Sequence, residues 1–276
     1  MSSGAFKNLA RRLLAVIARS DTACRVLLPA LREVERQRRG QDSEMVAAAL
    51  AKLPSLSVQH GPFRGLVYPA AEAHGSVLFP KLLGSYEREL HSVFDEILAV
   101  PLTAIVDIGC AEGYYAVGLA MRAPRIPVFA FDTDAQAREA CRRMAAINGA
   151  EARVTVGEEC SAHDLAQLPL GEHALVVSDC EGAERWIFTE QVAEALRPHH
   201  LVIELHDFVQ PGTGALLAQR LGRTHSILVL DALDDDARVE QYRYDELAPF
   251  TDRQRRRLLR EGRPEAMSWL VCSPSS

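Results

Sequence analysis

Seven short apolar runs recur between residues 103 and 272, and longer amphipathic stretches separate most of them. The runs span residues 103–109, 127–132, 153–156, 173–178, 200–205, 225–231 and 267–272. Short runs rich in Val, Ile and Leu indicate buried strands, whereas the stretches between them have helical periodicity. Strands that alternate with helices form a mostly parallel sheet with helices on both faces. The sequence therefore predicts an α/β domain over residues 101–276.

A basic segment opens the chain. Residues 1–55 are predicted to form an amino-terminal helical extension, because residues 5–39 place apolar side chains on one helical face and arginines on another. The first 40 residues hold nine basic and three acidic side chains, although the whole chain has a net charge of −6. The simplest interpretation is a helix packed on the main domain or on a second copy, as in a homodimer. Contact with a membrane surface or an acidic partner is the alternative.

Residues 56–100 are predicted to form a cap and a lead-in helix. Gly and Pro are frequent in residues 56–80, which favours an irregular cap or a small hairpin. Residues 84–100 have an amphipathic pattern and predict a helix. Tyr86 and Glu87 could reach from this helix over a ligand pocket, although a packed helix is the simpler interpretation.

The composition narrows the classes of function. The net charge of −6 argues against nucleic acid as a partner, and no run approaches the roughly 18–20 apolar residues of a membrane span. The six cysteines are scattered without a CxxC pair. In a chain of 276 residues this pattern indicates reduced thiols rather than disulfides or a metal finger. We therefore expect a cytoplasmic protein that acts on a small molecule and does not integrate into a membrane.

The first apolar run ends in VDIGCAEGYY, a glycine turn of the kind that binds nucleotides. Gly109 allows a sharp turn, and Gly113 allows a helix N-terminus to approach a ligand. A dinucleotide site would need further glycines where this chain has Ala111 and Tyr114, so an oxidoreductase is poorly supported. An acidic residue followed by GxGxG is typical of S-adenosylmethionine sites. The chain matches that pattern from Asp107 onward, with alanine for the middle glycine.

Four acidic residues are candidates for contacts to this cofactor. Asp107 and Glu112 could lie near its amino-acid end. Asp132 ends the second run, where a carboxylate can accept both ribose hydroxyls, although it could instead cap the next helix. After the third run, Glu158, Glu159 or Cys160 could lie near the adenine, and Glu159 is the candidate for that contact.

Two later runs also end in acidic side chains. The stretch SDCEGAERW supplies Asp179, Glu181 and Glu184, and the stretch ELHD supplies Glu204, His206 and Asp207. Neighbouring parallel strands end at the same edge of a sheet, so five of these groups should face one crevice: Asp179, Glu181, Glu204, His206 and Asp207. Methyl transfer to a hydroxyl needs the oxygen to be aligned and its proton removed.

We predict Asp179, Glu181 and His206 as catalytic residues, with His206 as the general base. Glu181 could equally belong to a helix start, and Glu184 is interpreted mainly as a helix-start residue. Asp179, Glu204, His206 and Asp207 could hold a divalent metal. No fixed ligand spacing demands one, so a metal is not predicted.

The segment SDCEGAERWIFTEQVAEALRPHHLVIELHD resembles the signature of the FkbM family, D-x-E-G-x-E followed by a helix and a strand ending in E-x-H. The resemblance covers about residues 76–210. It implies a class I S-adenosylmethionine-dependent methyltransferase with a seven-stranded, Rossmann-like, mostly parallel sheet. Members of the family usually methylate oxygen on a sugar, polyketide or other secondary metabolite. The alternatives are an N- or C-methyltransferase and a non-catalytic cofactor-binding or interaction protein of the same fold.

Overall fold

The computed structural model describes residues 43–263, 265 and 267–275. The chain divides into two compact units, Met1–Ala51 and Lys52–Ser276. In the first unit residues 43–50 are helical. The helices predicted over residues 5–39, and with them the homodimer contact, lie outside the described residues. The remaining description concerns the second unit.

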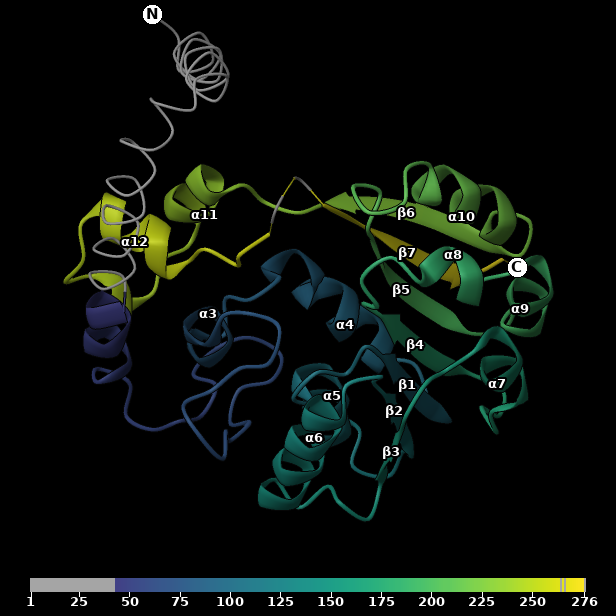
Figure 1. Ribbon diagram of the computed structural model, residues 1–276, viewed down its shortest axis with the longest axis horizontal. Coiled ribbons are helices and arrows are strands. Elements are labelled where there is room, and N and C mark those ends of the chain that lie inside the picture. Colours follow the sequence, from purple (N-terminus) through teal and green to yellow (C-terminus); the bar gives the residue numbers. More distant parts are fainter. Residues whose placement is uncertain (1–42, 264, 266, 276) are drawn as a thin grey trace, which may run out of the picture. The chain divides into compact units, whose positions relative to one another are not determined.

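The second unit is built on a seven-stranded sheet in the order β3-β2-β1-β4-β5-β7-β6 (Figure 1). The strands are β1 (Ala104–Ile108), β2 (Val128–Phe131), β3 (Val154–Gly157), β4 (Ala174–Ser178), β5 (His200–Leu205), β6 (His225–Asp231) and β7 (Ser268–Pro274). Strands β1 to β5 pair in parallel, and β7 runs antiparallel to both β5 and β6. This is the Rossmann-like fold of class I methyltransferases, so the predicted fold class is confirmed.

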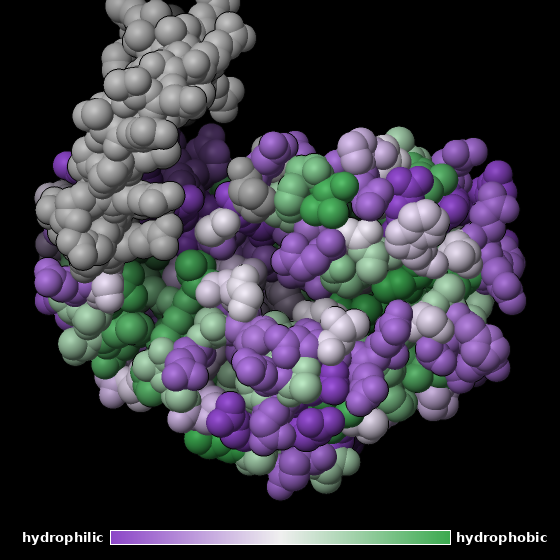
Figure 2. Space-filling view, viewed as in Figure 1, coloured by the Kyte–Doolittle hydropathy of each residue, from purple (hydrophilic) through white to green (hydrophobic). Residues whose placement is uncertain are grey.

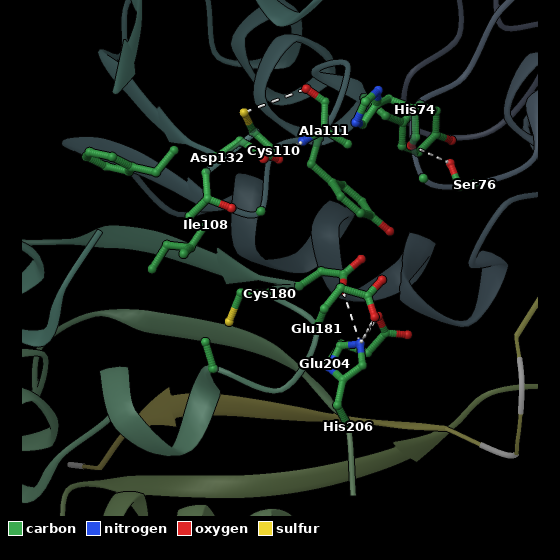
Figure 3. A pocket seen from close by; sticks show the side chains of 18 of the residues that line it. His74, Ser76, Ile108, Cys110, Ala111, Asp132, Cys180, Glu181, Glu204 and His206 are labelled. Carbon is green, nitrogen blue, oxygen red and sulfur yellow. Dashed lines mark hydrogen bonds and ion pairs between the residues drawn. The ribbon is translucent and has the colours of Figure 1, made fainter. Parts of the chain in front are cut away.

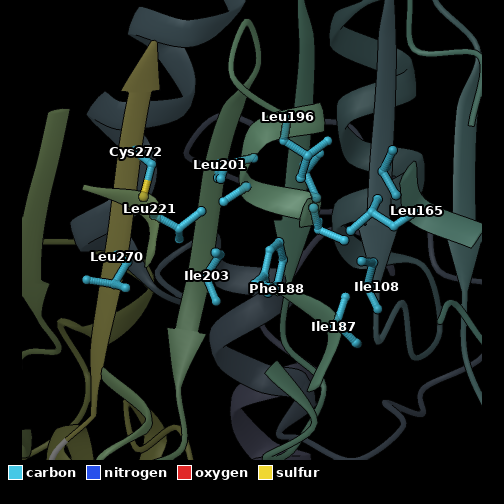
Figure 4. Packing of buried hydrophobic residues seen from close by; sticks show 14 of the residues in the cluster. Ile108, Leu165, Ile187, Phe188, Leu196, Leu201, Ile203, Leu221, Leu270 and Cys272 are labelled. Atoms are coloured by element: carbon cyan, nitrogen blue, oxygen red, sulfur yellow. The ribbon is translucent and has the colours of Figure 1, made fainter. Parts of the chain in front are cut away.

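One face of the sheet carries a large apolar core (Figure 4). Leu165, Phe188 and Leu221 come from the helical layer and pack against strand residues such as Val106 and Ile203. The helices on this side are α7 (Ala162–Gln167), α8 (Glu184–Ile187), α9 (Glu190–Ala195) and α10 (Thr213–Leu221). Burying side chains of this size stabilises the fold by about 1.5–3 kcal/mol each. The ends of β1, β4 and β5 are therefore held by a rigid core.

Further helices follow β1, β2 and β6. They are α5 (Tyr114–Arg122), α6 (Ala135–Ile147), α11 (Asp235–Gln241), η2 (Asp245–Leu247) and α12 (Asp252–Leu258). Helix α5 packs on β1, β2 and β3 and against α6. No helix among the described residues is long and apolar enough to cross a membrane.

The segment before β1 is more irregular than its sequence suggests. It contains α3 (Leu78–Leu83), and the short helix η1 (Arg88–Leu90) and α4 (His91–Leu98) replace the one helix predicted over residues 84–100. Only the bridge between Ser57 and Val67 represents the expected hairpin within the described residues. Glu87 has a left-handed φ of 48°, which interrupts the helical pattern.

An aromatic cluster fixes this segment on α5. The ring of Phe63 lies over Gly118, where a Cβ atom would come within 2.6 Å of it. The same ring packs edge-on against Tyr114 and Tyr115, with centroid distances of 5.1 and 5.8 Å.

Hydrophilic residues predominate on the face of the molecule in Figure 2, with smaller apolar patches between them.

Candidate active site

A cavity of about 710 Å³ lies at the carboxyl ends of the central strands (Figure 3). Its lining comes from the β1–α5 turn, the ends of β2 and β3, the loop after β4, the end of β5, the lead-in segment and the loop before β7. Open parallel sheets bind their ligands at this edge. The volume also lies within the usual range for small-molecule and cofactor sites, about 300–1,000 Å³.

The β1–α5 turn depends on left-handed backbone, a conformation that glycine adopts at the lowest cost. Gly109 has a φ of 86°, and a Cβ atom there would lie 1.7 Å from the carbonyl oxygen of Asp179. Ala111 has a φ of 46°, so it keeps the left-handed conformation that the missing middle glycine would favour. Gly113 has a φ of 97° and begins α5. The turn is thus close-packed on the neighbouring strand end.

Asp132 braces this turn from the end of β2. Its Oδ2 accepts a hydrogen bond of 2.9 Å from the backbone N–H of Ala111, and its Oδ1 accepts one of 2.8 Å from the N–H of Asp134. The N-cap of α6 is Asp134, whose side chain accepts from the N–H of Gln136. Asp132 is therefore not needed as the helix cap, and it lines the cavity beside Gly109 and Ala111.

Glu159 also lines the cavity, on the segment that follows β3. It is exposed. The nearby Ser161 and Asp164 form a capping box at the start of α7. The structure thus places Glu159 at the same end of the cavity as Asp132, next to Cys160.

Asp107 and Glu112 are not among the cavity-lining residues. Asp107 lies within β1, and burial raises its pKa to about 7. Glu112 accepts hydrogen bonds of 2.7 Å from the Nζ of Lys81 and 3.1 Å from the hydroxyl of Tyr68. Burial alone would raise the pKa of Glu112, but the ammonium of Lys81 outweighs burial and lowers it. Glu112 thus ties the glycine turn to the lead-in segment.

The opposite end of the cavity is organised around His206, which directly follows β5 and is only 1% exposed. Its Nε2 lies 3.4 Å from Oδ1 of Asp179, 3.6 Å from Oε2 of Glu181 and 3.7 Å from Oε2 of Glu204. Three of the residues predicted from the two acidic strand ends are thus brought together around the imidazole (Figure 3). Asp207 does not join this cluster, because its carboxylate accepts hydrogen bonds from the N–H groups of Gly212 and Gly214 at the start of α10.

Glu184 is the functional candidate whose role the sequence did not reveal. It begins α8, yet its carboxylate is fully buried and its Oε1 accepts a 2.6 Å hydrogen bond from Nδ1 of His206. Burial lowers the pKa of His206, but Glu184 and the neighbouring carboxylates outweigh burial and raise it. Burial likewise raises the pKa of Glu184, and His206 reverses that effect. The contact fixes the imidazole so that Nε2 faces the cavity.

A half-buried arginine lies beside this cluster. Arg263, in the loop before β7, contacts Glu204 and lies 2.9 Å from Oε1 of Glu87 and 3.1 Å from Oε2 of Glu261. Burial raises the pKa of Glu87 to about 8, and burial and the charge of Asp179 raise that of Glu204. One guanidinium thus serves four carboxylates, because Glu89 also lies 3.9 Å from it. No sequence motif marks Arg263, because three of its four partners are distant in the chain.

The proteins that the comparisons find include methyltransferases. No family model matches the chain. It is 29% identical over 110 residues to the ribosomal RNA small subunit methyltransferase C of Stutzerimonas stutzeri (strain A1501), and the match spans 40% of this chain but only 30% of that protein.

Two solved structures are similar at 13% identity. The precorrin-6y C5,15-methyltransferase of Geobacter metallireducens gives a TM-score of 0.45, with 69% of this chain and 90% of that chain covered. An S-adenosylmethionine-dependent O-methyltransferase of Thermotoga maritima gives 0.48, with 69% and 66% covered. The order and directions of the strands, rather than these likenesses, establish the fold.

Proposed function

We propose that the protein is an S-adenosylmethionine-dependent methyltransferase that methylates a hydroxyl oxygen of a small molecule, as members of the FkbM family do. The observation that carries this proposal is that one cavity joins a glycine turn braced by Asp132 to a buried histidine flanked by carboxylates. The first feature suits an adenosine ligand, and the second suits an acceptor that must lose a proton.

The residues of the chain divide the task between the two ends of the cavity. Asp132 would accept the ribose hydroxyls with the lone pairs that its two backbone contacts leave free. S-adenosylmethionine supplies an electrophilic methyl group, which the acceptor oxygen must meet in line. The cluster of Asp179, Glu181 and His206 would hold the acceptor hydroxyl and provide for the loss of its proton. Glu184 would keep the imidazole in the required orientation.

Labelled cofactor tests the proposal directly. The full chain is incubated with S-adenosylmethionine carrying an isotopic methyl group and with matched hydroxyl and amine acceptors, such as sugars and amino sugars. Mass spectrometry then locates the label. We expect transfer to oxygen. Transfer to nitrogen alone would contradict O-methylation, and failure to bind S-adenosylmethionine in calorimetry would contradict the proposal as a whole.

The variant His206→Ala tests the acceptor end. We expect turnover to fall about 100-fold or more, since proton handling contributes roughly 10²–10⁴-fold, while cofactor affinity stays within about twofold. His163→Ala is the matched control, because His163 is exposed and does not line the cavity. Full turnover in His206→Ala would remove this histidine from the reaction.

A further inference from the structure

The three catalytic candidates are spaced as the ligands of a metal ion would be. One donor atom from each of Asp179, Glu181 and His206 can be chosen so that all three lie within 4.8 Å of one another. The separations from Nε2, 3.4 and 3.6 Å, are long for a charged hydrogen bond. Donors that share an ion at about 2.0–2.2 Å lie roughly 3–4 Å apart, which matches these separations.

His206 points to a ligand independently of the acidic groups. Its side chain is 1% exposed, and Nδ1 must donate to Glu184 because a carboxylate only accepts. In the neutral imidazole, Nε2 therefore carries the lone pair with which a histidine ligates a metal ion, and Nε2 faces the carboxylates of Asp179 and Glu181. A carboxylate bound to the far nitrogen of a histidine is also the usual support of a metal-ligating imidazole.

Each of the two carboxylates has a feature that is consistent with a metal ligand. Oδ1 of Asp179 is buried and makes no hydrogen bond within the part of the chain that the structure describes. Glu181 has a left-handed φ of 54°, an uncommon conformation for a residue other than glycine. Its side chain is 78% exposed, yet Oε2 is turned toward His206. Strained backbone that aims a side chain is typical of functional sites.

The neighbouring groups do not supply the missing positive charge. Glu204 adds a further carboxylate 3.7 Å from Nε2, and Arg263 is shared among the carboxylates of Glu87, Glu89, Glu204 and Glu261. Asp207 is committed to the start of α10. The remaining donors, two carboxylates and one imidazole, leave coordination positions open toward the cavity.

We propose that Asp179, Glu181 and His206 bind one divalent cation at the acceptor end of the cavity. One nitrogen and two oxygen ligands suit a borderline ion such as Mn²⁺ or Zn²⁺ better than Ca²⁺, which prefers oxygen alone. The existence of the site does not depend on the activity. Its role does rest on the proposed function: the acceptor hydroxyl would occupy an open position, where the cation lowers its pKa.

Binding of Mn²⁺ can be measured without cofactor or acceptor. Chelator-treated full-length chain is titrated with Mn²⁺, and the loss of the free-ion signal in electron paramagnetic resonance gives the stoichiometry and affinity. We expect one ion per chain, displaced by Zn²⁺. Asp179→Asn and His206→Ala should each weaken binding about 30-fold or more, and Glu184→Gln about 10-fold, because outer-shell partners typically contribute 10–100-fold.

Glu158→Gln is the matched control. It removes a carboxylate that lines the same cavity at the other end, so Mn²⁺ affinity should not change. Circular dichroism verifies that each variant is folded. Absence of saturable Mn²⁺ binding by the wild-type chain would overturn the proposal. Equal affinity in folded His206→Ala would overturn it as well.

The failure of this site and the failure of the proposed function give different results. Methyl transfer at an undiminished rate in metal-free, chelator-containing buffer would contradict the catalytic role of the cation and leave the methyltransferase standing. Specific Mn²⁺ binding in a chain that never binds S-adenosylmethionine would support the site and contradict the function.

Discussion

The two ends of the cavity are built by different means. The glycine-turn end depends on backbone conformation, with Gly109, Ala111 and Gly113 all at positive φ and Asp132 bonded to main-chain N–H groups. The acceptor end depends on charged side-chain contacts, centred on the buried His206 and the half-buried Arg263. Backbone geometry leaves a local pattern in the sequence, whereas buried charge pairs join residues that can be far apart in it. The two ends should therefore respond differently to substitution.

The largest effect is expected at the glycine turn. Gly109→Ala would place a Cβ atom 1.7 Å from a backbone oxygen, at a φ of 86° that disfavours any side chain. Backbone on both sides would have to move. We expect a loss of more than about 3 kcal/mol in the free energy of unfolding, and no measurable binding of S-adenosylmethionine. Urea unfolding and calorimetry measure the two effects.

Gly149→Ala provides the comparison for this change. Gly149 also has a positive φ, 63°, but no atom lies within 4 Å of the Cβ that alanine would add. The cost there should be about 1–2 kcal/mol, from left-handed backbone alone, with cofactor binding intact. Similar losses in both variants would show that the close approach of Gly109 to the segment after β4 is not what constrains the turn.

Asp132→Ala should give the next largest effect. Loss of the carboxylate removes the ribose contacts and the brace on Ala111, and each hydrogen bond to a charged group contributes about 1.5–3 kcal/mol. We expect affinity for S-adenosylmethionine to fall about 100-fold in calorimetry. Asp134→Ala, which removes the N-cap of α6, should lower stability but keep affinity within about threefold.

An analogue of the cofactor product that lacks the ribose 2′-hydroxyl separates the two roles of Asp132. If the carboxylate binds the ribose, wild type and Asp132→Ala should bind this analogue with more similar affinities than they bind the parent compound. An equal loss of affinity for both compounds would mean that Asp132 only braces the turn.

The same contrast explains what the sequence could predict. All seven strands were located from their apolar runs. In β1 and β4 the run is continuous because these central strands are buried on both faces. The glycine turn was visible because unusual φ values require small residues. The role of Glu184 could not be predicted from the sequence. A glutamate at the start of a helix gives the same local pattern whether or not it also contacts a residue 22 positions away. Arg263 could not be found for a similar reason, as it contacts Glu87 across 176 positions.

A smaller effect is expected from Glu184→Gln. Glutamine can still accept a hydrogen bond from Nδ1 of His206 but lacks the charge that raises the pKa of the imidazole. We expect turnover to fall about 10-fold while affinity for S-adenosylmethionine and the unfolding midpoint change little. Glu190→Gln, at an exposed ion pair with Arg223, should behave as wild type. Unchanged turnover in Glu184→Gln would make Glu184 a purely structural partner of the histidine.

The smallest effect concerns Asp107, which lies in β1 beneath both ends of the cavity. Burial raises its pKa from 3.8 to about 7, so between these values the folded chain holds a proton that the unfolded chain has released. Stability contributed by this group should therefore decrease as the pH rises from about 4 to about 7. A carboxamide does not titrate in this range, so Asp107→Asn should remove at least about 1 kcal/mol of that decrease, since one pKa unit corresponds to about 1.36 kcal/mol.

The free energy of unfolding of wild type and Asp107→Asn is measured with urea at pH values of about 4.5 and about 7.5, which span most of the expected decrease in stability. Asp95→Asn is the control, because its carboxylate is largely exposed in the folded chain and should leave the pH dependence as in wild type. If Asp107→Asn shows the same pH dependence as wild type, the buried carboxylate is ionised in the folded chain at neutral pH. The negative charge behind the glycine turn would then be one more charge that favours a cation in the cavity in front of it.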